Sequence, residues 1–194
     1  MSESGPKRRP SGGLRLFFAL WPAAEERRAL TQAAAAAVAA SGARPIPEGN
    51  LHLTLAFLGN VERARLGSLR ALARTWVPPA SAPPLRLRFE TLQHWHRPQI
   101  LCATAVQASG AAALAVRIRE SARAAGFSPD LKPFQAHVTV ARQVAQAPEE
   151  QPMPPVSWNC SAFALVVSTT GAESGSVYSV LETYPLDGPD NAHK

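Results

Sequence analysis

A short segment that occurs twice is the strongest constraint on the fold of this chain. Residues 52–57 have the sequence HLTLAF and residues 137–142 have the sequence HVTVAR, so His-x-Thr stands twice among aliphatic side chains. A single histidine on a strand is usually a hydrogen-bonded structural residue. The repetition instead indicates two equivalent positions. We therefore expect the chain to fold as two similar halves that each supply one copy.

Side chains alternate between the two faces of a strand, which gives each copy two different surfaces. In the first copy we expect His52, Thr54 and Ala56 on one face, and Phe57 on the other face with the leucines. The apolar face can then be buried, while the other presents an imidazole beside a hydroxyl. Such a face can hold a small anion. The second copy repeats the arrangement from His137.

The rest of the chain carries alternating strand and helix signals, so each half contributes strands, helices and one copy of the motif. Proline near a first turn and glycine after a last turn mark the helices. We expect strands at 14–20, 85–89, 100–106, 162–168 and 177–184, helices at 23–40, 62–76 and 111–125, and loops at 94–98 and 148–155.

The length of 194 residues suits one domain, which we place at 14–187 between two less ordered ends. We expect residues 1–13 to be a disordered basic tail and residues 188–194 a flexible C-terminus. The apolar run near the N-terminus is too short for a signal peptide, and no segment approaches the ~20 apolar residues of a membrane span. We expect a monomer with no membrane contact.

Two cysteines, Cys102 and Cys160, each lie in an apolar strand-like run without the close Cys or His spacing of a zinc site. We interpret both as buried thiols, which suits a reducing compartment and predicts a cytoplasmic protein.

The formal charge of +6 comes from 17 arginines and 3 lysines, and the chain contains only three aspartates. The chain therefore offers few aspartate carboxylates from which a metal site or an acid–base dyad could be built. A polyanionic partner such as RNA is favoured over a cationic one.

Two imidazoles that face each other across a groove, each beside a threonine, can cleave a phosphodiester. One neutral histidine removes a proton from the nucleophile, one imidazolium protonates the leaving oxygen, and the hydroxyls hold the phosphoryl oxygens. This chemistry requires no metal and no cofactor. Histidine suits both roles because its ordinary pKa of ~6.5 makes both protonation states available near neutral pH, which predicts a bell-shaped pH dependence.

Four segments extend the pattern into a family likeness, namely 15–20 (RLFFAL), 50–59 (NLHLTLAFLG), 137–142 (HVTVAR) and 178–181 (YSVL). With them the chain resembles the two-histidine phosphoesterases, specifically the RNA 2′,3′-cyclic phosphodiesterases of the LigT/ThpR family, from residue 15 to residue 186. The resemblance implies a bilobal α+β fold, duplicated about a pseudo-twofold axis, with antiparallel sheets flanking a central groove and helices packed outside. It also implies hydrolysis of an RNA terminal 2′,3′-cyclic phosphate to a 2′-phosphate.

The resemblance also suggests roles for the motif residues. His52 would be the proton donor to the 3′ oxygen, His137 the proton acceptor that activates water, and Thr54 and Thr139 the ligands of the nonbridging oxygens. The residues alone leave acid and base open between two similar histidines. Some relatives also join RNA ends through a 2′,5′ linkage, and that activity would use the same groove.

The chain departs from the family pattern just before the second histidine, where Gln135 and Ala136 stand in place of a basic residue and a proline. Arg142 is a candidate phosphate ligand, although strict alternation places it opposite His137 unless the strand bulges.

Three further side chains are candidate substrate contacts. Ser168 and Tyr178 would line the groove, and Trp95 could stack on a base; ordinary structural roles remain open for each of them. Arginines between 62 and 76 either form a solvated helix face or track an RNA backbone.

His94 and His96 invite a metal interpretation, but no acidic ligand stands beside them and a hairpin loop is favoured. Three rival functions remain: a noncatalytic RNA-binding protein, a phosphodiesterase of the same superfamily acting on a small nucleotide or 2′,5′-oligoadenylate, and a metal-dependent hydrolase. Loss of activity with a chelator would indicate the last.

Overall fold

The computed structural model describes residues 13–79, 82–171 and 175–186. The expected basic tail, apart from Gly13, and the expected C-terminal segment 188–194 lie outside these residues. Within them no helix is both long enough and apolar enough to cross a membrane.

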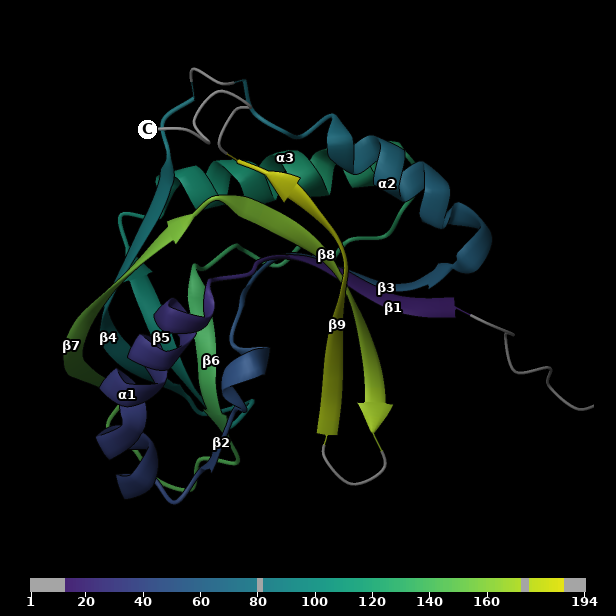
Figure 1. Ribbon diagram of the computed structural model, residues 1–194. Coiled ribbons are helices and arrows are strands. Elements are labelled where there is room, and N and C mark those ends of the chain that lie inside the picture. Colours follow the sequence, from purple (N-terminus) through teal and green to yellow (C-terminus); the bar gives the residue numbers. More distant parts are fainter. Residues whose placement is uncertain (1–12, 80–81, 172–174, 187–194) are drawn as a thin grey trace, which may run out of the picture.

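Two antiparallel sheets form the framework, as the sequence predicted (Figure 1). The four-stranded sheet has the order β3-β1-β8-β9 and the five-stranded sheet has the order β2-β6-β5-β4-β7. The strands are β1 (Gly13–Leu20), β2 (Arg44–Pro45), β3 (Leu53–Glu62), β4 (Leu85–Trp95), β5 (Ile100–Val106), β6 (His137–Arg142), β7 (Glu150–Cys160), β8 (Ala162–Gly171) and β9 (Gly175–Pro185). The helices are α1 (Ala24–Ala40), α2 (Leu66–Arg74) and α3 (Ser109–Ala124), with 3-10 turns η1 (Glu48–Asn50) and η2 (Arg63–Arg65).

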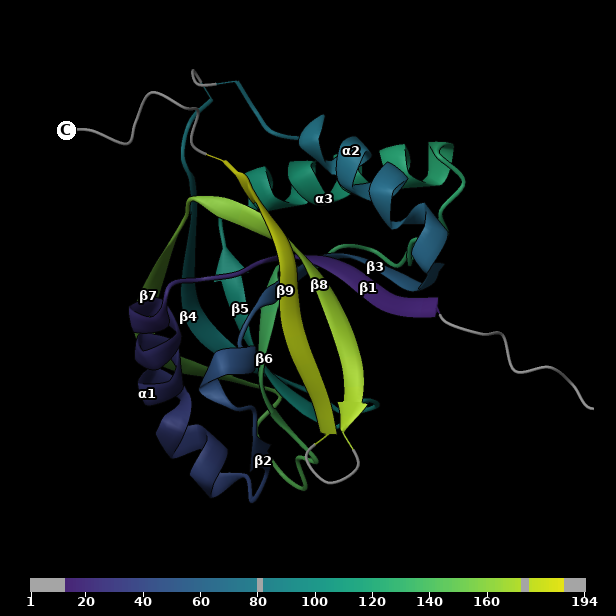
Figure 2. The same ribbon diagram turned by 45° about the vertical axis from the view of Figure 1, so that its right-hand side comes forward.

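The order of elements repeats around the two motifs. β1, α1 and β3 correspond to β5, α3 and β6, and in both sets the two strands pair antiparallel. α1 lies against β7 and β6, while α3 lies against β3 and β4. Figure 2 shows α2 and α3 side by side at one end of the molecule and α1 at the other. Each motif strand is therefore covered by a helix from the other half of the chain.

One apolar core runs through both sheets and includes Phe18, Phe89, Trp158 and Phe163. A second, smaller cluster lies under the first motif. It is built from Phe17 and Ala19 of β1 and Ala164 and Val166 of β8, with Trp21, Phe57 and Tyr178 packed against it. This small cluster gives the first motif a firm apolar support.

A bulge in β3 changes the expected faces of the first motif. Ala19 pairs with Thr54 and Phe18 pairs with Ala56, so Leu55 is the extra residue. Ala56 consequently joins the core, and Phe57 turns to the groove face. The prediction from strict alternation of side chains along the strand therefore gave the wrong face for both Ala56 and Phe57. The Leu55 carbonyl accepts a hydrogen bond from Nε of Arg119 on α3 at 3.1 Å, so the bulge leaves this acceptor satisfied.

The second motif has a bulge at the corresponding position. Leu101 pairs with Ala141 and Cys102 pairs with Thr139, which leaves Val140 as the extra residue. The Val140 carbonyl accepts a hydrogen bond from the backbone N–H of Ile46 at 2.9 Å. Arg142 is thereby brought to the same cavity as His137.

Most of the proline-rich stretch 148–155, expected as a loop, instead belongs to β7, which begins at Glu150. β7 is an edge strand, so Pro152, Pro154 and Pro155 can lack an N–H without breaking the ladder on both sides. Proline alone therefore gave the wrong prediction here.

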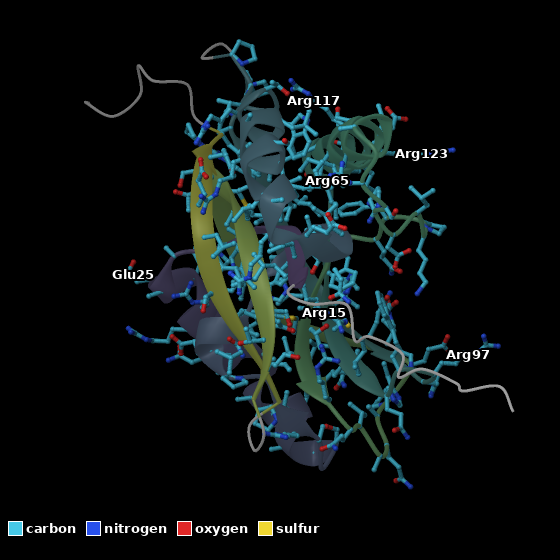
Figure 3. All side chains as sticks on the ribbon, turned by 90° about the vertical axis from the view of Figure 1, so that its right-hand side faces the viewer. Arg15, Glu25, Arg65, Arg97, Arg117 and Arg123 are labelled. Atoms are coloured by element: carbon cyan, nitrogen blue, oxygen red, sulfur yellow. The ribbon has the colours of Figure 1, made fainter. Side chains whose placement is uncertain are left out.

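The hairpin loop expected at 94–98 begins later than predicted, because β4 continues to Trp95. His94 is a buried strand residue, and the turn occupies 96–99 with Gln99 at a positive φ of 51°. Arg97 extends away from the sheets at this turn (Figure 3). Among the described residues, no group of three or more His, Cys, Asp or Glu side chains is arranged to hold a metal ion.

Three arginines of the second helical segment make contacts within the protein. Arg65 donates hydrogen bonds to the carbonyls of Ala125 and Gly126 at 2.8 and 2.9 Å. Arg70 and Arg74 form ion pairs with Glu182 of β9 at 3.1 and 2.7 Å. These contacts attach α2 to its neighbours; Arg63 and Arg74 are nevertheless exposed, whereas Arg65 and Arg70 are half-buried.

Candidate active site

A cavity of about 590 Å³ is lined by residues of both motifs. β1, β3, β8 and β9 contribute from one sheet, and β2, β5 and β6 contribute from the other. Seven of the eight site residues proposed from sequence line it: His52, Thr54, His137, Thr139, Arg142, Ser168 and Tyr178. The two motifs therefore meet at one site, although they are far apart in sequence.

The two histidine rings are held in the same way. Nδ1 of His52 lies 2.7 Å from the backbone oxygen of Asn50, and Nδ1 of His137 lies 2.7 Å from the backbone oxygen of Gln135. A carbonyl oxygen can only accept, so Nδ1 carries the hydrogen in both rings. Nε2 of each neutral ring then has a lone pair and is left for a ligand in the cavity.

Asn50, whose backbone oxygen holds His52, is itself held in position by local structure and by a hydrogen bond. Asn50 ends the η1 turn, and its side-chain amide donates to the backbone oxygen of Ser176 on β9 at 3.2 Å. The residue two positions before each histidine thus acts through its main chain. Sequence reasoning missed this role because it does not depend on side-chain type.

Aromatic rings pack around His52. Trp21 stacks on it with centroids 5.4 Å apart and an interplanar angle of 11°, while Tyr178 meets it edge-on at 5.1 Å. Phe17 lies 5.0 Å away on a third side. These contacts fix the ring and shield much of it from water, while it still borders the cavity. Trp21 was not among the predicted residues, because nothing in the local sequence connects it with the motif.

Trp95 packs against the second histidine rather than lining the main cavity. Its ring centroid lies 4.4 Å from that of His137, and its Nε1 donates to Oε1 of Gln93 at 3.5 Å. Trp95 therefore orients His137 from the side.

Burial lowers the pKa of His52 from 6.5 to about 4. The hydrogen bond to Asn50 opposes this shift, and the nearby charges of His137 and Arg142 add to it. Burial likewise lowers the pKa of His137, against the hydrogen bond to Gln135. Both imidazoles are therefore neutral near pH 7 in the unliganded protein. An anion bound between them would favour protonation, because it stabilises the imidazolium form.

A buried thiol lies behind the second threonine. Cys102 Sγ is 3.8 Å from Thr139 Oγ1, and burial raises the pKa of the Cys102 thiol to about 12. The thiol stays protonated at ordinary pH. Cys102 and Cys160 are both buried thiols, as the sequence predicted.

Positive charge dominates the cavity wall. Arg15, Arg44 and Arg142 line it, and among the described residues no aspartate or glutamate does. The guanidinium of Arg15 lies 4.8 Å from the ring centroid of Phe57, the residue that the β3 bulge turns to this side. Arg15 and Phe17 share the groove face of β1, so the predicted strand could have indicated Arg15 through its alternation. The wall suits a phosphate-bearing ligand.

Comparisons with known proteins agree with this geometry. The family model described as LigT like Phosphoesterase matches residues 20–100. An RNA 2′,3′-cyclic phosphodiesterase of Thermus thermophilus is 34% identical over 191 residues, which cover 90% of this chain and 91% of the relative. The enzyme of the same name from Escherichia coli is 31% identical, with 82% of this chain and 87% of the relative covered.

A solved structure shows the same fold. The crystal structure of Escherichia coli LigT complexed with 3′-AMP superposes with a TM-score of 0.76 at 28% identity, covering 90% of this chain and 98% of that one. Sequence and fold thus agree along most of the chain, and this protein belongs to the family of LigT-like phosphoesterases.

Proposed function

We propose that this chain hydrolyses a 2′,3′-cyclic phosphate at the end of RNA to a 2′-phosphomonoester, using His52 and His137 without a metal ion. The observation that carries the proposal is the matched pair of histidines on one cavity, each held at Nδ1 by a backbone carbonyl. The relatives named RNA 2′,3′-cyclic phosphodiesterase support the choice of substrate.

In the proposed reaction, Nε2 of neutral His137 accepts a proton from water as the water oxygen attacks phosphorus. The bond between phosphorus and the 3′ oxygen breaks, and Nε2–H of protonated His52 donates its proton to that oxygen. The products are a 2′-phosphate and a 3′-hydroxyl. His137 then carries the proton taken from water and His52 is neutral, and proton exchange of both rings with solvent restores the starting state.

The remaining polar groups stabilise charge on the phosphoryl group. Thr54 and Thr139 donate hydroxyl hydrogen bonds to the nonbridging oxygens, and Arg142 balances the negative charge of the transition state. The lowered pKa of His52 adds a condition, because the proton donor is neutral until the anionic substrate binds. Substrate binding and protonation of His52 are therefore linked.

The buried thiols support a reducing compartment, and we place the activity in the cytoplasm. We expect the protein to act as a monomer, since one chain supplies both histidines of the cavity. Sedimentation of the purified protein at working concentration tests this expectation.

The decisive experiment offers the purified protein an oligoribonucleotide ending in a 2′,3′-cyclic phosphate in the presence of EDTA. We expect a 2′-phosphate product. His52→Ala and His137→Ala should each lower kcat by about 10² to 10⁴-fold, because each removes one proton-transfer group. His96→Ala at the exposed β4–β5 turn is the matched control and should retain activity. Dependence on added metal, or normal turnover in either active-site variant, would contradict the proposal.

A further inference from the structure

A second cavity, of about 500 Å³, opens on the same face of the five-stranded sheet as His137. Thr104 on β5 pairs with His137 and also with Thr91 on β4. Directly paired residues project to the same side, so the polar face of β6 continues across β5 and β4. The second cavity therefore begins one strand away from the proposed site of phosphate chemistry.

The chemistry of this cavity differs from that of the first. Among the residues that the structure describes, no lysine or arginine lines it; its polar side chains come from Thr91, Gln93, Thr104, Gln135 and Glu150. A carboxylate repels phosphate, whereas amides, hydroxyls and a carboxylate suit the edge of a nucleobase. The half-buried ring of Phe134 and several alanines supply apolar surface for its face.

Hydrogen bonds across the sheet hold the polar groups in place. Oε1 of Gln93 accepts from Nε2 of Gln135 at 3.2 Å and from Nε1 of Trp95 at 3.5 Å. Nε2 of Gln93 donates to Oε2 of Glu150 at 3.1 Å, and the two residues are cross-strand partners. Both Oε1 and Nε2 of Gln93 are thereby used in hydrogen bonds within the protein. Oε1 of Glu150, in contrast, has no hydrogen bond or ion pair within the described chain.

The same network reaches the reacting groups. Gln135 contributes its side chain to the second cavity and its backbone oxygen to Nδ1 of His137. A base bound against Gln135 and Glu150 would therefore lie next to the phosphate held between the histidines. The volume is within the range of small-ligand sites, roughly 300 to 1,000 Å³.

We propose that this second cavity binds the base of the nucleotide that carries the cyclic phosphate, and that Glu150 selects a base with an exocyclic amine. Glu150 accepts from such an amine, as carboxylates do from N4 of cytosine. Uracil has nearly the same shape but presents an oxygen at that position, which a carboxylate repels. The inference rests on the proposed function and adds a preference for cytosine over uracil.

The test compares kcat/KM for 2′,3′-cyclic CMP and 2′,3′-cyclic UMP. We expect the wild-type protein to favour cytosine by about 5-fold, the low end of the discrimination given by a good base contact, because Glu150 is exposed. Glu150→Gln should bring the ratio close to one, because the amide can also donate to O4 of uracil. Glu149→Gln removes the same charge at the neighbouring exposed position and should keep the wild-type ratio.

Binding of 3′-CMP and 3′-UMP, measured by calorimetry, gives the same comparison without turnover. A lower affinity for 3′-UMP that disappears in Glu150→Gln supports the base site even if no cyclic phosphate is hydrolysed, in which case only the proposed function fails. Equal ratios in Glu150→Gln and Glu149→Gln would overturn the inference. So would equal rates and affinities for the two bases in the wild-type protein, even with full activity.

Discussion

Acid destabilisation through His52 is a prediction that follows directly from the packing of this ring. Trp21, Phe17 and Tyr178 enclose the imidazole, and burial lowers its pKa to about 4. In the unfolded chain the pKa is ~6.5. The unfolded state therefore binds a proton at a higher pH than the folded state. His52 favours folding fully above pH ~6.5, and this contribution is lost as the pH falls toward 4.

The magnitude follows from the two pKa values. Each pKa unit corresponds to ~1.4 kcal/mol, so lowering the pKa from 6.5 to about 4 corresponds to about 3 kcal/mol of unfolding free energy. Most of this is lost by pH ~4.5. Such a change is a large part of the ~5–15 kcal/mol that stabilises an ordinary domain.

Urea unfolding followed by tryptophan fluorescence, at pH 7.5 and pH 4.5, measures the loss. Other groups also titrate in this range, so the informative quantity is the difference between wild type and His52→Gln, which cannot be protonated. We expect the variant to lose about 2 to 3 kcal/mol less than wild type between the two pH values. His96→Gln, at an exposed position, should lose as much as wild type. Equal losses in wild type and His52→Gln would refute the assignment of a buried neutral imidazole.

Two further predictions concern catalysis. Because both histidines have lowered pKa values in the free protein, kcat/KM should be greatest below pH ~6.5. The maximum of kcat should lie at higher pH, because bound phosphate favours protonation of the histidines. Both profiles are measured on one cyclic nucleotide, and coincident pH profiles of kcat and kcat/KM would count against this linkage. Arg142→Gln should lower kcat/KM roughly 10- to 100-fold through loss of a charge-assisted contact, with Arg142→Lys between the two and Arg97→Gln at the solvent-exposed turn unchanged. Steady-state rates on the same substrate measure this, and normal activity in Arg142→Gln would remove this residue from the phosphate site.

The sequence was sufficient to predict the two motif strands, their convergence in one α+β fold and seven of the residues that line the cavity. It failed where one extra residue shifts the alternation. The bulges at Leu55 and Val140 leave the apolar pattern almost unchanged, because Ala56 and Ala141 are small enough for either face. The positions of Phe57 and Arg142 therefore depend on strand pairing, which periodicity does not record.

Other differences also arise from contacts between distant parts of the chain. β7 tolerates its prolines because it lies at an edge, and sheet order is a property of the whole fold. Trp21 stacks on His52 because β1 and β3 are neighbours. The backbone carbonyls of Asn50 and Gln135 hold the two rings whatever their side chains are, so residue type gave no signal.

Because each motif strand is covered by a helix from the other half of the chain, the two halves should depend on each other when the chain is cut into fragments. α1 backs the strand of the second motif and α3 backs the strand of the first, while β8 and β9 complete the first sheet from the far end of the chain. A fragment ending after α2 would lack β8, which pairs with β1 in the middle of the first sheet. It would also lack α3, so the apolar surface of β3 that α3 covers would be exposed. Neither fragment should be stable alone, but two fragments cut between α2 and β4 should recombine when mixed, since each supplies what the other lacks.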